Sequence, residues 1–188
     1  MKKKWILLIV VVLLAGTAVT VSAQLRLDMD ITVPVYLGFT ASSGVSQGVW
    51  NSYFIPLPNA RLAWQFGDGL IDGGVGLRMF TYIIENIAYP EAFVELNVDR
   101  FTFAANVGGY GFLEFGLLSS LLQEAGVGNL SGFHNLIIPD VSAQFRVNDW
   151  FRVSAGVLML APFGANIGGI FDNFAYFGYI NAKFVVKF

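Results

Sequence analysis

Hydrophobic residues occupy every second position over long stretches of this chain. Within residues 25–39 all the odd positions are apolar, whereas the even positions include Arg26, Asp28 and Asp30. Successive residues of a β-strand point to opposite sides, so an extended strand here has one apolar face and one charged face. A helix would scatter the three charges around its circumference. The run is also long enough to cross a membrane at a tilt, which takes about 9–11 residues.

The same alternation recurs along the chain and predicts eight strands, within residues 25–39, 56–66, 71–83, 92–98, 101–110, 140–147, 151–159 and 175–188. Longer loops are expected at residues 40–52, 85–91, 111–135 and 161–174, and tight turns at 67–70, 99–100 and 148–149. Long and short connections therefore alternate, as in bacterial membrane barrels with short periplasmic turns and longer outer loops. Because the strand number is even, both termini are expected on the side of the short turns.

Composition supports an all-β, eight-stranded antiparallel up-and-down transmembrane β-barrel. The chain has 188 residues, of which 55% are hydrophobic, 15% aromatic and 13% charged, and its mean hydropathy is +0.62. This apolar content is spread as alternation and not as a second helical span. A secreted lipocalin-like barrel also has eight strands, with its apolar residues inside. Alternation alone does not exclude that alternative, but aromatic residues gather near both ends of the predicted strands, as membrane interfaces require.

The first 23 residues have the pattern of a secretory signal peptide. Residues 2–4 are lysines, residues 5–14 are apolar, and residues 21–23 resemble a cleavage site with small residues. Cleavage before Gln24 leaves a single barrel domain at residues 24–188. Of the 11 Lys and Arg residues, removal of three leaves 8 against 13 Asp and Glu, a net charge of −5. This charge gives no reason to expect nucleic-acid binding. The chain has no cysteine, which excludes disulfides, thiolate metal sites and a cysteine nucleophile.

The last residues carry a family resemblance. Phe184, Val186 and Phe188 alternate up to a terminal phenylalanine, and this pattern resembles the C-terminal assembly signal of bacterial outer-membrane barrels. Over residues 24–188 the chain resembles the small eight-stranded outer-membrane proteins, the group with the OmpA membrane domain, OmpX and OmpW. The resemblance implies the outer membrane of a diderm bacterium, termini in the periplasm, and outer-membrane lipid and the barrel-assembly machinery as partners.

The inward face of the predicted barrel is charged in its turn-side half. The residues concerned are Arg26, Asp28, Asp30, Arg61, Asp72, Arg78, Glu95, Arg146, Arg152, Lys183 and, at the last strand end, Lys187. An eight-stranded barrel is filled by its own side chains, and charges buried there must pair. We therefore expect a plug of salt bridges, with an ion path as the alternative. Asp28 and Asp30 are expected to neutralise arginines and not to act as an acid–base pair.

The loop-side half of the same face is aromatic and apolar. Its residues are Tyr36, Phe80, Tyr82, Phe93, Tyr110, Leu158, Phe177 and Tyr179. They either pack to close the barrel mouth or line a pocket for a small apolar molecule. The resemblance to the OmpW group implies such a pocket. The expected function is therefore a barrel that binds or passes small apolar molecules. The alternative is a closed structural or surface-interaction barrel that displays its outer loops.

The sequence does not predict an enzyme, a cofactor or a metal site. The single histidine, His134, lies in the third loop near Ser131 and Asp140, without the motif or spacing of a lipid hydrolase. In the same loop, leucines with helical spacing predict a short helix that ends at Gly126 and covers the rim. These residues are Leu113, Leu117, Leu118, Leu121, Leu122 and Ala125. The alternative is that the helix acts as a lid over the aromatic pocket.

Three prolines predict a weak lateral seam between the first two strands. Proline cannot donate a ladder hydrogen bond, and Pro34, Pro56 and Pro58 fall in these strands. If the intervening loop folds symmetrically about Ser46, Pro34 faces Pro58. A seam of missing donors would then lie beside the aromatic pocket. In OmpW-like barrels a lateral gap is proposed to release apolar cargo into the bilayer. The alternative is that the prolines lie above the membrane, where they cost little.

Overall fold

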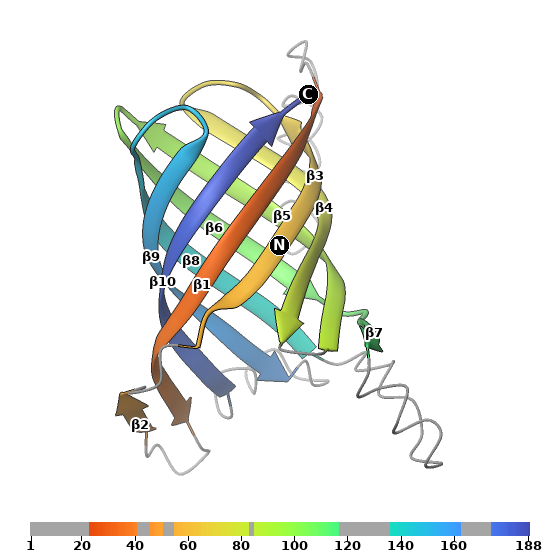
Figure 1. The fold of residues 1–188 in the computed structure, drawn as a ribbon, viewed down its shortest axis with the longest axis vertical. Coiled ribbons are helices and arrows are strands. Elements are labelled where there is room, and N and C mark those ends of the chain that lie inside the picture. The colour runs from red at the N-terminus through yellow and green to blue at the C-terminus, as the bar shows by residue number, and fades with distance from the viewer. Residues whose placement is uncertain (1–22, 41–45, 51–54, 83–84, 117–135, 163–173) are drawn as a thin grey trace, which may run out of the picture.

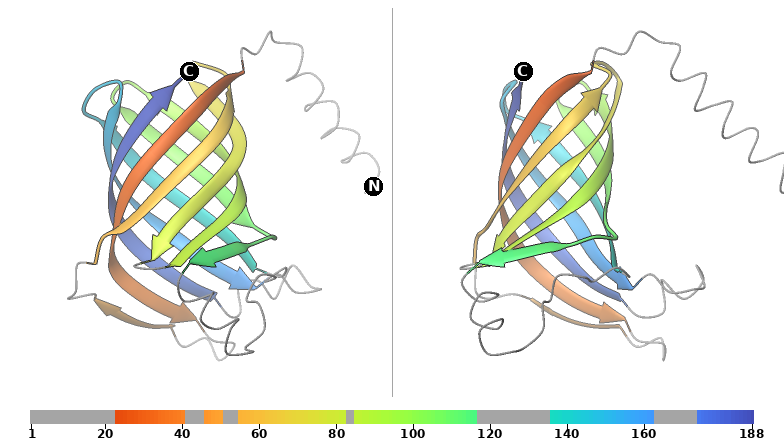
Figure 2. Two further views of the ribbon diagram at one scale, coloured as in Figure 1. Left: turned by 45° about the vertical axis from the view of Figure 1, so that its right-hand side comes forward. Right: turned by 90° about the vertical axis from the view of Figure 1, so that its right-hand side faces the viewer.

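The computed structural model describes residues 23–40, 46–50, 55–82, 85–116, 136–162 and 174–188, and the structural statements below concern these residues. Eight strands form a closed antiparallel barrel (Figure 1), in which each strand pairs with the next and the last returns to the first. The strands are β1 (Gln24–Thr40), β3 (Leu57–Phe66), β4 (Ile71–Tyr82), β5 (Glu85–Val98), β6 (Phe101–Gly109), β8 (Leu136–Arg146), β9 (Phe151–Pro162) and β10 (Phe174–Lys187). The predicted fold is confirmed, and two further views show the closed cylinder and its tilted strands (Figure 2).

Two short strands extend the barrel at its loop end. β2 (Ser46–Trp50) pairs with the end of β1, and β7 (Leu113–Gly116) pairs with the beginning of β5. The three tight turns lie at the opposite end, together with the C-terminus (Figure 1). Gly67 and Asp99, with φ values of 86° and 52°, adopt the left-handed conformation in two of these turns. The turn end and the loop end are therefore structurally distinct.

Residues 85–91 belong to β5, so the prediction of a loop there is wrong. Pro90 prompted that prediction, because proline is rare inside strands. In the structure, β5 pairs with β7 up to Ala88 and with β6 from Glu91 onward. Pro90 lies at this change of partner and has no partner in the ladders with β6 or β7, whereas on the other side the ladder with β4 continues, with Leu77 opposite Pro90. The strand can therefore continue through the proline and carry Glu91 into the lumen.

The predicted helix in the third loop is partly contradicted. Leu113–Gly116 forms strand β7 and not the first turn of a helix. The remainder of the predicted helix, together with His134 and Ser131, lies outside the described residues. None of the described residues forms a helix long and apolar enough to cross a membrane.

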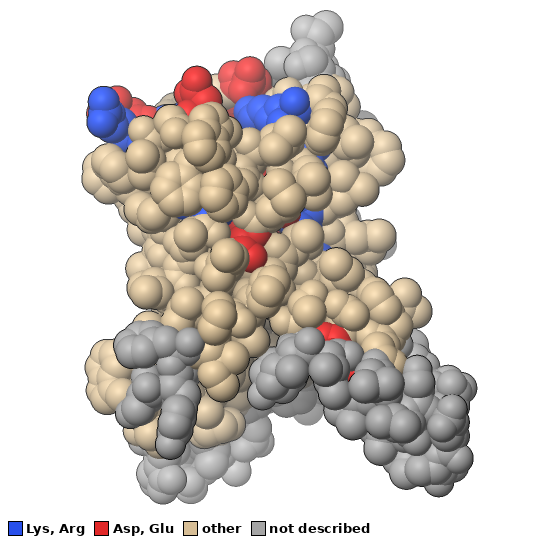
Figure 3. All heavy atoms as spheres, in the orientation of Figure 1, with Lys and Arg blue, Asp and Glu red and all other residues tan. Residues whose placement is uncertain are grey.

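The barrel has a charged interior and an apolar exterior. Leu77 and Val94 on the outer face are 61% and 54% exposed, whereas Arg26 and Glu95 inside are fully buried. Figure 3 shows a largely uncharged wall, with acidic and basic side chains gathered at the turn end. A soluble lipocalin-like barrel would have the reverse distribution, and so large an apolar surface is unfavourable in water. The distribution is that of a transmembrane barrel.

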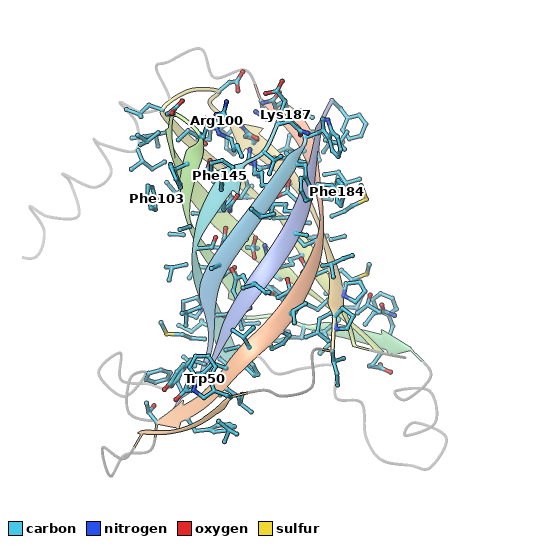
Figure 4. The ribbon with its side chains drawn as sticks, turned by 60° about the vertical axis from the view of Figure 1, so that its left-hand side comes forward. Trp50, Arg100, Phe103, Phe145, Phe184 and Lys187 are labelled. Atoms are coloured by element: carbon cyan, nitrogen blue, oxygen red, sulfur yellow. The ribbon has the colours of Figure 1, made fainter. Side chains whose placement is uncertain are left out.

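Aromatic residues mark both ends of this apolar wall. Phe103, Phe145 and Phe184 project from the wall near the turn end, whereas Trp50 lies at the loop end (Figure 4). Trp150 stacks on Phe184 with ring centroids 5.7 Å apart. Aromatic side chains favour the two interfaces of a bilayer, so the two groups indicate where lipid headgroups would lie.

The assumed register between the first two long strands is wrong. Ile31, and not Pro34, faces Pro58, and Pro56 precedes β3. The first loop does not fold symmetrically, because β2 first forms its own hairpin with the end of β1. The chain then reaches β3 by a separate connection, and the register of β1 with β3 differs from that with β2.

We expect arginine at position 77 to destabilise the barrel far more than arginine at position 71. Both residues face outward on β4, but Leu77 is central and Ile71 lies at the turn end. In lipid, arginine costs about 2–4 kcal/mol at the midplane and about 0–1 kcal/mol near the interface. Denaturant unfolding of Leu77→Arg and Ile71→Arg in lipid vesicles measures the difference. Equal effects of the two substitutions would contradict a membrane-spanning wall.

Candidate functional site

The lumen holds a charged network centred on Arg26. The Arg26 guanidinium donates to Asp28 at 2.7 Å, to both oxygens of Glu95 at 2.8 Å and to Gln65 at 3.2 Å. These four residues are fully buried and come from β1, β3 and β5. Strand alternation places these side chains in the lumen, and closure of the barrel brings them into contact there.

Arg61 and Arg152 extend this network to other strands. Arg61 donates to Asp28 and, at 3.0 Å, to Glu91, and its guanidinium lies 4.0 Å from the centre of the Phe93 ring. Arg152 of β9 donates to Glu95 at 3.2 Å. Cation–π contact and bidentate carboxylate pairing are both favoured by the planar guanidinium. Each buried carboxylate at this level has at least two cationic neighbours.

A second layer lies towards the loop end and is centred on Asp140. Arg78 contacts Asp140 at 3.2 Å and Glu91 at 3.1 Å, and Asn106 donates to Asp140 at 3.1 Å. The Tyr179 hydroxyl donates to the other oxygen of Asp140 at 2.6 Å. Tyr179 thus has its hydroxyl in the charged layer and its ring towards the loop end, where it separates charged from apolar surroundings.

The two layers together are electrically neutral. They contain five cations and five carboxylates: Arg26, Arg61, Arg78, Arg152 and Lys183 with Asp28, Asp30, Glu91, Glu95 and Asp140. All ten side chains are buried, so the network fills the cross-section of the lumen at this level. Neutrality matters because an unpaired ion in this space would carry a large desolvation cost. Asp28 is engaged with two arginines and is not available as an acid–base catalyst.

Three residues predicted for the plug, Asp72, Arg146 and Lys187, lie at its edges, whereas Lys183 lies within it. Asp72 accepts from the amide of Gly69 and from Asn97, at the turn end. Arg146 donates to the carbonyl of Asp99, Lys187 pairs with exposed Asp68 at 3.0 Å, and Lys183 lies 4.0 Å from Asp28. The prediction of a loop at residues 85–91 kept Glu91 out of the predicted plug. The predicted plug also omitted Asp140, although the alternation of residues 140–147 already places the Asp140 side chain on the inward face.

Above the network, on the loop side, lies a cavity of about 520 Å³. Its lining is almost entirely apolar and includes Phe80, Tyr89, Ile138, Leu158, Phe177 and Tyr179 from five strands. Pockets that bind small molecules typically have volumes of about 300–1,000 Å³ and apolar linings with a few polar groups. The size and chemistry of the cavity suit a small apolar molecule.

The structure places four of the eight predicted pocket residues in this cavity, namely Phe80, Leu158, Phe177 and Tyr179. Phe93 lies lower, against Arg61, and Tyr36 packs beside Trp50 with ring centroids 5.1 Å apart. Tyr110 is 65% exposed, and the Tyr82 side chain lies outside the described part of the chain. The sequence analysis did not predict six other residues that line the cavity, namely Ile87, Tyr89, Phe112, Leu136, Ile138 and Leu160. Three of them lie within the predicted loops and three lie beside those loops.

Glycines on neighbouring strands hold the aromatic rings in place. A Cβ atom on Gly108 would lie 2.4 Å from the Tyr89 ring, and one on Gly156 would lie 2.5 Å from the Tyr179 hydroxyl. Each ring therefore occupies the space that a side chain on the facing strand would need. Cross-strand packing of this kind restricts both tyrosines to the cavity floor.

The cavity adjoins the place where β1 changes partner. Pairing of β1 with β3 ends at Thr32 and Leu57, and pairing with β2 begins at Tyr36 and Trp50. On its other side, the register of β1 with β10 shifts between Pro34 and Tyr36. Pro34 and Leu57 also line the cavity, whereas Pro58 is exposed on the outer face. The change of pairing partner along β1 therefore lies at the same height in the barrel as the apolar cavity.

Among the described residues, no group of three or more His, Asp or Glu side chains is arranged to hold a metal ion. The candidate site is thus a cavity over a charge network.

Comparisons with known proteins yield similarities of structure. No family model matches the chain, and no curated protein matches it. Neisserial surface protein A (NspA) has 11% sequence identity and a TM-score of 0.44, with 87% of this chain and 97% of that chain covered. Ail, the attachment invasion locus protein of Yersinia pestis, solved with a heparin analogue, has 8% identity and a TM-score of 0.31, with 87% and 99% covered. The resemblance to small eight-stranded outer-membrane barrels is confirmed at the level of architecture by the closed ring itself.

We expect Glu95→Gln to destabilise the barrel by about 3–5 kcal/mol, because it removes the buried counter-charge of Arg152 and leaves Arg26 with Asp28 alone. Lys187→Ala is the matched control, since it removes an exposed ion pair with Asp68 and should cost less than about 1 kcal/mol. Denaturant unfolding of both variants in lipid measures the two changes. Similar values would show that the network is not coupled as the contacts indicate.

Proposed function

We propose that this chain is an outer-membrane barrel that binds a small apolar molecule in its loop-side cavity. The observation that carries the proposal is the apolar cavity of about 520 Å³ above a neutral charge network. A barrel that only displayed loops could fill this space with larger side chains. Instead, Tyr89 and Tyr179 occupy the space over Gly108 and Gly156 that a side chain at either glycine would need, and the cavity remains open beside them.

The proposed orientation places the cavity towards the outside of the cell. The signal-peptide pattern of residues 1–23, the short turns and the charged turn end support termini in the periplasm. Export followed by assembly through the C-terminal strand is proposed as the route to the outer membrane. A ligand would then enter from the external medium or from the outer leaflet.

The charge network favours binding over conduction along the barrel axis. A molecule in the cavity would have to displace paired, buried charges such as Arg78 and Asp140 to continue towards the turn end. The remaining route is lateral, where β1 passes from β3 to β2 beside Pro34. We propose this lateral seam, with Pro34, Pro56 and Pro58 around it, as the exit into the bilayer.

Filling the cavity should abolish ligand binding. Leu158 lines the cavity and Val157, its neighbour on β9, lies against the outer groove. Leu158→Trp should weaken binding of the uncharged dye phenylnaphthylamine by roughly tenfold or more, since overpacking excludes it. Val157→Trp is the matched control and should bind normally.

Fluorescence titration of refolded protein in lipid nanodiscs, corrected with empty discs, gives both affinities. Absence of dye binding to the wild type would favour the closed structural barrel. Equal binding by both variants would place the dye elsewhere on the protein.

A disulfide across the seam should separate binding from release. Cysteines at Val33 and Pro56, which would face each other if the β1–β3 register continued by one position, would tie the two segments together. Oxidation should slow dye transfer through the protein into vesicle bilayers and leave cavity binding intact. A pair at Ile31 and Pro58, which already face each other, is the control. Unchanged transfer in the oxidised Val33–Pro56 pair would refute lateral release.

A further inference from the structure

We propose that two grooves on the outer wall bind a diacyl phospholipid whose headgroup carries a phosphate and a primary ammonium. Phosphatidylethanolamine has this chemistry, and its headgroup would lie at the turn that contains Asp99 and Arg100. The inference goes beyond the loop-side cavity and does not depend on ligand binding there. It rests on the course of the grooves across the strands and on the charges at the end where both grooves begin.

The first groove has a volume of about 560 Å³ and crosses β6, β8, β9, β10 and β1. One of its edges is a row of outward residues that face one another directly across the ladders, namely Phe101, Phe145, Val153, Ala182 and Ile31. Phe101 begins β6 at the turn end, whereas Ile31 lies near the middle of β1. The groove therefore descends obliquely from the interface at the turn end towards the middle of the bilayer.

The second groove, of about 510 Å³, lies beside the first. It begins on β5 at Leu96 and Val94 and crosses β6 and β8 to β9. The two grooves share Ala143 and Ala155, which face each other on β8 and β9. These short side chains leave space above the sheet that larger residues would fill. Two neighbouring grooves suit the two acyl chains of one lipid.

The length of the first groove suits one leaflet of a membrane. Four steps between neighbouring strands, each of about 4.8 Å, give a length of about 19 Å. The hydrocarbon layer of one leaflet is about 15 Å thick, which is half of the bilayer core, and an oblique path through it is longer. An acyl chain that starts at the turn end can therefore follow the groove over its whole length.

Two opposite charges lie where both grooves begin. Asp99 and Arg100 form the turn between β5 and β6, and both are exposed. Neither side chain forms an ion pair within the described part of the chain. Arg100 lies at the turn end above Phe103 and Phe145 (Figure 4). A headgroup above the grooves would therefore meet an available cation and an available carboxylate.

The other charges of this region make a zwitterionic headgroup the better match. Arg146 adds a second cation, and its guanidinium donates to the backbone carbonyl of Asp99. Asp149, in the next turn, adds a second exposed carboxylate. With two cations and two carboxylates, the two turns have no net charge to attract a purely anionic headgroup. A phosphate can pair with Arg100, and an ammonium can donate hydrogen bonds to Asp99, which a choline group cannot do.

Native mass spectrometry of the refolded protein, titrated in detergent with single phospholipids, tests the site. Three probes have the same dioleoyl chains: phosphatidylethanolamine, phosphatidylcholine, whose headgroup has no N–H donor, and phosphatidylglycerol, which has no ammonium. We expect one bound phosphatidylethanolamine per barrel. Its affinity should exceed that of either other lipid by roughly threefold to fivefold, as one exposed ion pair implies.

A change of charge assigns the preference to the turn. Asp99→Asn should bring phosphatidylethanolamine and phosphatidylcholine to equal affinity, and asparagine suits the left-handed backbone at this position, where φ is 52°. Asp68→Asn is the matched control, because it removes another exposed turn carboxylate, one that already pairs with Lys187. It should retain the preference.

A change of shape assigns the acyl chains to the grooves. Ala155→Leu adds bulk in both grooves and should weaken binding of all three lipids by roughly fivefold or more. Ala92→Leu is the matched control, because Ala92 faces outward on β5 and lines neither groove. It should leave the three affinities unchanged.

Several outcomes would overturn the inference. Wild-type protein that binds no phospholipid, or equal binding by Ala155→Leu and Ala92→Leu, would exclude the grooves as the site. Equal affinity of the wild type for phosphatidylethanolamine and phosphatidylcholine, or tightest binding of phosphatidylglycerol, would refute the ammonium contact whether or not any variant folds. A preference for phosphatidylethanolamine that persists in folded Asp99→Asn would refute it as well.

Discussion

The ion pairs of Arg26 with Asp28 and Glu95 are the contacts on which the interior of this barrel depends. Closing eight strands into a ring leaves a lumen narrow enough to be filled by side chains. A membrane requires the outer face to be apolar, and strand alternation then assigns the polar residues to the inside. Once charges are inside, they must be paired, since an isolated ion there is strongly disfavoured. The neutral set of five cations and five carboxylates satisfies that constraint.

The network also explains why a cavity can exist above it. Tyr179 and Tyr89 lie at the boundary, with their rings in the apolar cavity, and the Tyr179 hydroxyl is bound to Asp140. Because Gly108 and Gly156 accept these rings closely, the rings do not need to turn into the space above. The lumen thus changes from paired charge to apolar surface within the length of a few residues. Such a boundary separates the paired charges from an apolar compartment on their loop side.

The wall beside the cavity is less regular than the rest of the barrel. β1 is the longest strand, and it exchanges β3 for β2 while its register with β10 shifts. A closed barrel has no edge strands, so an exchange of partner is one of the few places where its ladder can be interrupted. The polar row of Thr32, Asn59 and Asn181 lies just below this exchange. The polar row, the apolar cavity and the irregular wall are therefore consecutive features along β1.

Local alternation and turn residues were enough to predict the eight barrel strands, the three tight turns and the face on which each charge lies. Alternation has a period of two, so the sidedness of Arg26, Asp28 and Glu95 follows from local pattern alone. Tertiary structure decided the partners and heights of these residues. Glu91 and Tyr89 enter the lumen because Pro90 falls at a change of strand partner. Phe93 and Tyr36, which local pattern grouped with the pocket, lie below and outside it. Height depends on strand register, and register depends on long-range pairing that no local pattern encodes.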